Sequence, residues 1–162
     1  MTAISSSTRL MLAQQALAES DADLLLVTPS SDLRYLIGYA GHVSERPTLL
    51  VVPAGGDPFV LIAGFEASGL AGVDGLNVVP YGETEDPYVT LRDVVRSPVR
   101  RAVVNDQAWA IVLLRLQATF PDASFGSASP LLGAMRMRKR PDEIDLLRKA
   151  GAMADAAFDV LG

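Results

Sequence analysis

Short apolar runs bounded by turn residues divide this chain into segments that predict buried strands. The two clearest runs are Leu24–Val27 and Leu49–Val52. Their unbroken Leu and Val content is typical of a sheet that is covered on both faces. The long connection between them carries groups able to bind a ligand, namely Tyr35, Tyr39, His42, Glu45 and Arg46. Because long ordered connections in compact domains are often functional, we expect part of any site to lie here.

The rest of the chain alternates between strand-like and helix-like segments. Strands are expected at residues 23–27, 48–52, 58–63, 76–80, 101–105 and 123–125, and helices at residues 9–19, 33–37, 65–70, 88–95, 108–119 and 131–137. The first helix has N-cap hydroxyls available within Ser5–Thr8. Glycines in the turn Ala54–Asp57 predict a hairpin, and hence one antiparallel pair of strands. This order predicts a mixed, mostly parallel α/β sheet flanked by helices.

Residues 135–162 have a different character. A basic stretch, Met135–Arg140, is followed by Pro141 and two acidic residues, which is a favourable start for a helix. Apolar or small residues then recur at alternating spacings of three and four, at Ile144, Leu147, Gly151, Ala154, Phe158 and Leu161. A helix this apolar needs a partner over much of its circumference. Two interpretations stay open: the helix docks on its own sheet, or it begins a second domain that is missing. We expect domains at residues 1–134 and 135–162.

Composition narrows the class of protein. The chain has 162 residues, of which 49% are hydrophobic and 20% charged, as in a globular protein with a sizeable core. Its formal net charge of -5 argues against general binding to nucleic acid or anionic membranes. The sequence shows neither a membrane-spanning apolar run nor a secretory signal. Cysteine is absent, which suits a reducing compartment, so a cytoplasmic location is expected.

The sequence holds no complete catalytic apparatus. Its single histidine and lack of cysteine exclude a Cys/His cluster or a two-histidine metal site within one chain. Phosphate-binding glycine loops and the GxSxG motif are absent as well. The acidic loop Glu83–Asp86 could bind a hard cation, although three acids in a loop are more typical of a solvated turn. Trp109 lies among apolar residues at helical spacing, which favours a place in the core.

The connection between the first two strands therefore holds the best candidates. Arg46 presents a rigid fork of donors that matches a carboxylate, and could act as an anion clamp. The structural alternative is that Arg46 pairs with Glu45 or Asp32 and fixes the loop. His42 is equally open to a binding role or to none. Of Tyr35 and Tyr39, one is expected to be buried against the sheet.

The residues of this region resemble a known family. The segments Asp23–Val27, Tyr35–Tyr39, Glu45–Pro47 and Leu49–Pro53, in this order, resemble the amino-terminal domain of creatinases, prolidases (Xaa-Pro dipeptidases) and aminopeptidases P. The tail Met135–Ala150 resembles the junction at which the catalytic domain of that family begins. The resemblance implies a ribonuclease-H-like sheet, followed by a "pita-bread" domain that holds two divalent metal ions, usually manganese, cobalt or zinc. Their ligands lie beyond this junction, so no metal ligand and no catalytic residue is expected in this chain.

The resemblance also implies a role for the candidate residues. We expect a non-catalytic domain that serves dimerisation and shapes the active-site entrance of the partner subunit. Arg46, His42 and Tyr39 would then contact a proline-containing peptide across the homodimer. The full protein, with its own C-terminal catalytic domain, would be a metal-dependent Xaa-Pro peptidase, whereas this chain alone would be inactive. The alternatives are a peptide- or histone-binding module without catalysis, and the domain of a creatinase-like amidinohydrolase. The last is disfavoured because Ser44 stands where creatinases have an aromatic residue.

Overall fold

The strands pair into one six-stranded sheet in the computed structural model, which describes residues 6–161. The strands are β1 (Leu24–Val27), β2 (Leu49–Pro53), β3 (Phe59–Ala63), β4 (Asn77–Tyr81), β5 (Arg101–Val104) and β6 (Ser124–Ser127). Their order across the sheet is β4-β3-β2-β1-β5-β6. Strand β2 is antiparallel to β1 and β3, and the other neighbouring pairs are parallel. The predicted mixed, mostly parallel sheet and its hairpin are therefore confirmed.

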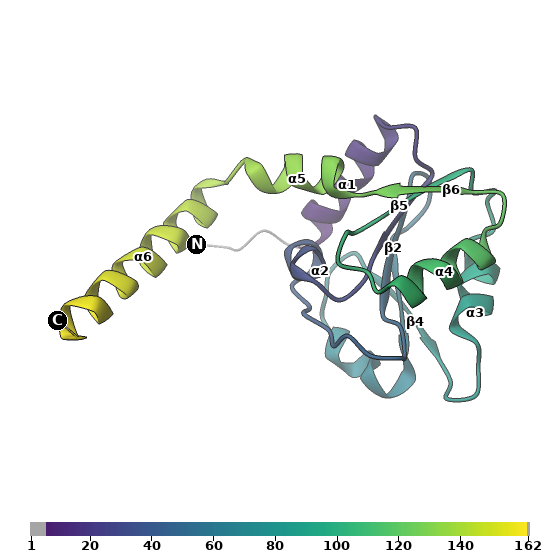
Figure 1. The fold of residues 1–162 in the computed structure, drawn as a ribbon, viewed down its shortest axis with the longest axis horizontal. Coiled ribbons are helices and arrows are strands. Elements are labelled where there is room, and N and C mark those ends of the chain that lie inside the picture. Colours follow the sequence, from purple (N-terminus) through teal and green to yellow (C-terminus); the bar gives the residue numbers. More distant parts are fainter. Residues whose placement is uncertain (1–5, 162) are drawn as a thin grey trace.

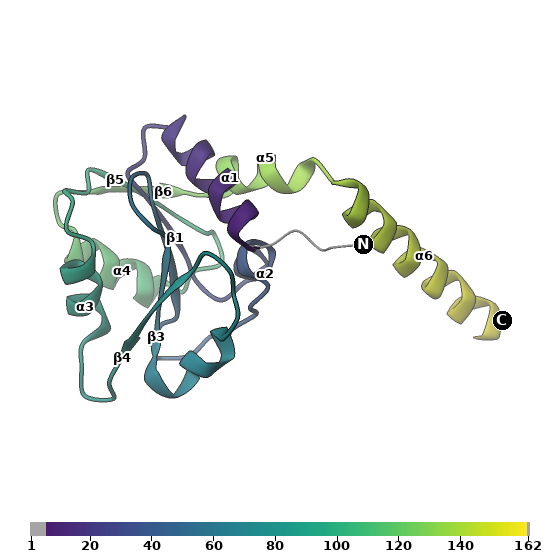
Figure 2. The same cartoon turned by 180° about the vertical axis from the view of Figure 1, so that it is seen from behind.

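Helices cover both faces of this sheet (Figures 1 and 2). They are α1 (Ser6–Ala18), α2 (Ser31–Ile37), the 3-10 helix η1 (Gly64–Leu70), α3 (Pro87–Val94), α4 (Ala110–Thr119), α5 (Ser129–Met137) and α6 (Pro141–Leu161). Helices α1, α2, η1 and α5 contribute to one core, and α3 and α4 to the other. Successive strand residues point to opposite cores, as Leu25 and Leu26 do, which explains why the central strands β1, β2 and β3 are almost entirely apolar.

Most element boundaries lie within one to three residues of the prediction. Helix α2 shows the local reasons, because the hydroxyl of Ser30 accepts from the backbone N–H of Leu33, and Gly38 ends the helix at φ 74. The first helix begins at Ser6, earlier than expected, and Ser5, part of the expected N-cap stretch, lies outside the described residues. The segment after β3 is a 3-10 helix, where an ordinary helix was expected.

Helix α6 leaves the α/β body and extends away from it (Figures 1 and 2). Five of its large apolar side chains are between 57% and 85% exposed, at Leu146, Leu147, Met153, Phe158 and Val160. The interpretation in which this helix docks along its own sheet is therefore wrong. Only its base is tied down: the Arg9 guanidinium lies 3.2 Å from the Glu143 carboxylate and also donates to the carbonyl of Tyr35.

Candidate functional site at the carboxyl edge of the sheet

The connection that carries the candidate residues lies at the carboxyl edge of the sheet. All strands except β2 run in one direction, so their carboxyl ends share one edge with the start of β2. The chain passes from β1 outward through β2, β3 and β4, and then crosses to β5 on the other side of β1. Ligands of α/β sheets bind outside the carboxyl ends of strands, at such a reversal of strand order.

The loop of residues 38–48 is anchored at both ends. At its start Gly41 has φ 65, and an added Cβ would lie only 3.1 Å from a side-chain carbon of Pro29, so glycine is required. At its end the buried Tyr81 hydroxyl donates to the carbonyl of Pro47 over 3.0 Å. Burial raises the pKa of Tyr81 to about 12, which keeps this hydroxyl protonated and able to donate. The middle of the loop is thus exposed between fixed supports.

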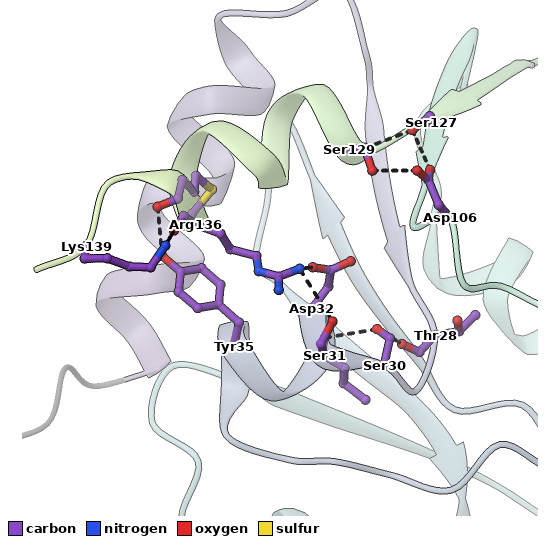
Figure 3. Close-up of polar contacts among 12 residues, drawn as sticks. Thr28, Ser30, Ser31, Asp32, Tyr35, Asp106, Ser127, Ser129, Arg136 and Lys139 are labelled. Atoms are coloured by element: carbon purple, nitrogen blue, oxygen red, sulfur yellow. Dashed lines mark hydrogen bonds and ion pairs between the residues drawn. The ribbon is translucent and has the colours of Figure 1, made fainter. Parts of the chain in front are cut away.

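Arg46 does not pair with Glu45 or with Asp32. Its guanidinium lies 3.6 Å from the Glu83 carboxylate and 5.2 Å from the centre of the Phe65 ring. The Arg46 and Glu83 side chains are 47% and 77% exposed, and ion pairs this exposed contribute little to stability. Asp32 instead binds Arg136 at 2.6 Å (Figure 3). Arg46 is therefore oriented by its neighbours and still accessible to a ligand.

Arg46 lines two recesses. A pocket of about 200 Å³ is lined by Arg46, Phe65, Tyr81, Glu83 and other residues. A much smaller recess of about 20 Å³ lies between the loop and the start of α4. Its lining is Thr28, Pro29, His42, Val43, Ser44, Arg46, Pro47, Thr48, Gln107, Trp109 and Val112. We call it the loop–α4 recess. Both His42 and Arg46, two candidates of the sequence, belong to its lining.

Tyr39 lines neither recess. Its ring packs beneath the loop against one of the cores, where an added Cβ at Gly69 would come within 3.2 Å of it. Tyr35 packs against the same core, and its hydroxyl donates to the carbonyl of Met135 over 3.4 Å. Both tyrosines are half-buried. The expectation that one of them is buried against the sheet is therefore wrong.

Trp109 is a second correction, because its side chain is 47% exposed and not part of the core. Helix α4 begins at Ala110, so Trp109 occupies the N-cap position, where its side chain makes no capping hydrogen bond. The expected helix began two residues too early and therefore placed the indole on an inward face. Trp109 therefore lines the same recess as His42, which the apolar pattern of the sequence did not predict.

Buried polar groups lie directly beneath this edge. The Asn105 side-chain oxygen accepts from the backbone N–H of Thr28 over 2.8 Å and from its hydroxyl over 3.0 Å. Among the described residues, the Asn105 side-chain nitrogen and the Thr48 hydroxyl are buried without a partner. The sequence marks these positions only as polar residues at the ends of apolar strands, which is a weak but usable signal.

The acidic loop does not form a metal site. Glu83 pairs with Arg46, and Glu85 accepts from the backbone N–H of Gly82 over 2.7 Å. Asp86 accepts from the backbone N–H of Tyr88 and also binds Arg115, and these hydrogen bonds lower the pKa of Asp86. Across residues 6–161, no three histidine, aspartate or glutamate side chains gather so as to hold a metal ion.

Another polar cluster on this edge has a structural explanation. Asp106, just after β5, accepts hydrogen bonds from the hydroxyls of Ser127 and Ser129 (Figure 3). These bonds lower the pKa of Asp106. They tie the end of β6 and the start of α5 to the loop after β5, so the cluster orders the edge of the sheet.

Comparison with known proteins decides the family. The family model of the Creatinase/Prolidase N-terminal domain matches residues 9–138. The chain belongs to this family. A probable dipeptidase PepE of Mycobacterium bovis is 36% identical over 151 residues, and the match covers 91% of this chain and 40% of the relative. An Xaa-Pro dipeptidase of Lactobacillus helveticus is 28% identical, with 91% and 42% covered. The fold and the family expected from the sequence are thus confirmed.

Solved structures agree with this assignment. The crystal structure of dipeptidase PepE from Mycobacterium ulcerans superimposes with a TM-score of 0.86 at 32% identity, over 95% of this chain and 42% of that one. A proline dipeptidase structure from Streptococcus pneumoniae shares the fold, with a TM-score of 0.74 at 23% identity, over 80% of this chain and 98% of that one. The chain spans about two-fifths of the length of the curated relatives that it matches. Among the described helices, none has the length and apolar character needed to cross a membrane.

Proposed function

We propose that this chain is the non-catalytic N-terminal domain of an Xaa-Pro dipeptidase or a related aminopeptidase. The main support is the 36% identity to a probable dipeptidase, which extends over 91% of the chain. In this proposal residues 1–134 form the α/β domain, and residues 135–162 are the linker and first helix of a metallopeptidase domain. Two observations favour that division: the family match ends at residue 138, and the apolar side chains of α6 are exposed.

The proposed catalytic domain would hold two divalent metal ions, such as manganese, cobalt or zinc. It would supply the activated water that cleaves the peptide bond. The residues described here offer no site for such ions, so this chain would not hydrolyse peptides by itself. Its proposed partners are its own catalytic domain, a second copy in a homodimer and a proline-containing peptide, in a cytoplasmic setting.

The proposed contribution of this domain is the loop of residues 38–48. Arg46 and His42 would reach the active-site entrance of the partner subunit and hold the carboxylate of the substrate. The support is geometric, since both side chains are exposed on a loop whose two ends are fixed. Tyr39 would act indirectly in this proposal, since its half-buried ring packs against the core and supports the loop.

The experiment that tests the proposal begins with the coding sequence beyond Gly162. Two Asp, one His and two Glu in metal-binding order are expected there. The extended protein should hydrolyse Xaa-Pro dipeptides with added Mn²⁺, while the 162-residue chain shows only background. Loss of those ligands would contradict the peptidase assignment and favour a peptide-binding module. Hydrolysis of creatine in place of dipeptides would favour an amidinohydrolase.

A further inference from the structure

We infer that the outer side of α4 is a contact surface for α4 of a second copy of this chain, with the two helices antiparallel about Leu114. The inference rests on the homodimer of the proposed function, and it adds the contact surface and the register of the two helices. We call Ala110, Ile111, Leu114 and Ala118 the α4 stripe.

The first observation is the apolar character of the side of α4 that faces away from the sheet. Val112 and Leu116 are buried beneath the helix and define its inner side. With about 100° between successive residues, the α4 stripe lies on the opposite side. Ile111 and Leu114 are 58% and 60% exposed, and the two alanines are exposed as well. The outer side of a surface helix normally carries charged or polar residues, so this one indicates a contact surface.

Charge limits which partner this surface accepts. Arg115 is the only charged residue of α4, and its guanidinium binds the Asp86 carboxylate and lies 4.9 Å from the centre of the Tyr88 ring. Arg115 is thus turned toward α3, and the α4 stripe itself carries no charge. A charged partner surface would lose its solvation here without gaining an ion pair, so an apolar partner surface is favoured. A second α4 stripe meets this requirement.

The position of α4 argues against the following domain of the same chain as the partner. Helix α6 leaves the α/β body at the end opposite to α4, as both views show (Figures 1 and 2). In the proposed domain division the chain continues from the far end of α6, away from the α4 stripe. The stripe is therefore available to another chain.

The α4 stripe is also complementary to itself in shape. In an antiparallel pair related by a two-fold axis at Leu114, each Ile111 lies opposite Ala118 of the partner subunit, and the two Leu114 side chains meet at the axis. A large side chain opposite a small one lets two helices interdigitate closely. A helix of ten residues is only about 15 Å long, so this contact is smaller than the ~800 Å² per partner of a stable interface. It is therefore weak in the 162-residue chain and one part of a larger interface in a stable dimer.

The chain contains no cysteine, so one introduced cysteine reports on this contact without background. Leu114→Cys should give a disulfide-linked dimer on oxidation with copper–phenanthroline, seen as a doubled mass on a non-reducing gel. The reason is that helices packed about 8–10 Å apart bring Cα atoms at the axis within the ~7 Å that a disulfide spans. Met11→Cys on α1 is the matched control, because Met11 is 61% exposed but its helix covers the other face of the sheet. It should stay monomeric.

The register has a test of its own. Ile111→Cys alone should stay monomeric, because its two copies are about 10 Å apart along the helix axis. The double variant Ile111→Cys/Ala118→Cys should cross-link, because these positions lie opposite each other. Cross-linking by Ile111→Cys alone but not by Leu114→Cys would overturn the register.

A charge at the axis tests the contact without a cross-link. Leu114→Glu places two carboxylates together and should abolish the self-association that sedimentation velocity detects at high concentration, whereas Met11→Glu should leave it unchanged. Both side chains are exposed, so the variants should fold as the original chain does. Equal cross-linking of Leu114→Cys and Met11→Cys would reflect random collision and would overturn the inference. An extended protein that is dimeric but does not cross-link through Leu114→Cys would contradict the α4 contact alone, whereas a monomeric one would contradict the proposed homodimer as well.

Discussion

The buried hydroxyl of Tyr81 holds the loop that carries Arg46, and Tyr81→Phe removes it without altering the ring. The hydroxyl donates to the carbonyl of Pro47 over 3.0 Å, and both residues are buried. Loss of this bond leaves a buried carbonyl unpaired, which should lower the free energy of unfolding by about 1–2 kcal/mol. For a domain of this size the melting temperature should fall by about 3–6 °C.

The pH dependence of this loss of stability shows whether the Tyr81 hydroxyl causes it. Folding raises the pKa of Tyr81 from 10.0 to about 12, so its contribution is fully present below pH 10 and is lost as the pH rises toward 12. With these pKa values, the difference in unfolding free energy between the original chain and Tyr81→Phe should shrink by about 1.4 kcal/mol at pH 11. Urea unfolding at pH 8 and pH 11 measures this. Tyr35→Phe, which loses only a 3.4 Å bond at a half-buried site, is the control. If the original chain and Tyr81→Phe have the same unfolding free energy at pH 8, or differ by the same amount at both pH values, this reasoning is refuted.

Three further predictions concern other parts of the fold. Arg9→Ala breaks a pair with Glu143 whose side chains are only 20% and 17% exposed, and should cost about 1–3 kcal/mol of unfolding free energy by calorimetry. Arg148→Ala breaks a largely exposed pair with Asp145 on α6 and should lower the free energy of unfolding by less than about 0.5 kcal/mol. Equal losses in Arg9→Ala and Arg148→Ala would show that the Arg9–Glu143 pair does not hold the base of α6. Gly38→Ala forces alanine to φ 74 and should cost about 1–2 kcal/mol in urea unfolding, whereas Gly55→Ala should be nearly neutral, and a neutral Gly38→Ala would be contrary evidence. Backbone amides of α6 should exchange hydrogen much faster than those of β1, and equal protection would show that the helix is packed.

The apolar pattern was enough to predict the sheet and most of its helices. Strands such as Leu24–Val27 are buried on both faces, so their composition alone identifies them. Glycine and serine at the ends of α2 act locally, and local chemistry can be read from a sequence. The family motifs carried the same information. The candidate loop was chosen because it lies between two such strands.

Contacts between distant residues could not be predicted in this way. The structural alternative for Arg46 was a pair with Glu45 or Asp32, but the fold brings Glu83 from the loop after β4. Trp109 was assigned to the core because it lies among apolar residues at helical spacing, but the helix begins only at Ala110 and leaves Trp109 at the N-cap position. The unpaired hydroxyl of Thr48 is likewise a consequence of packing, since nothing in the sequence shows which neighbours a buried threonine lacks.

The most direct test of the proposed function is the kinetics of Arg46→Ala in the protein that includes its catalytic domain. If Arg46 holds the substrate carboxylate, a charge-assisted hydrogen bond worth about 1.5–3 kcal/mol is lost, and kcat/KM for an Xaa-Pro dipeptide should fall about ten- to a hundredfold. Most of the change should be in KM, and His42→Ala should show a smaller effect in the same direction. The melting temperature should hardly change, because the pair with Glu83 is exposed. An unchanged KM together with a lowered melting temperature would show that Arg46 is structural and would contradict the proposed role of this loop.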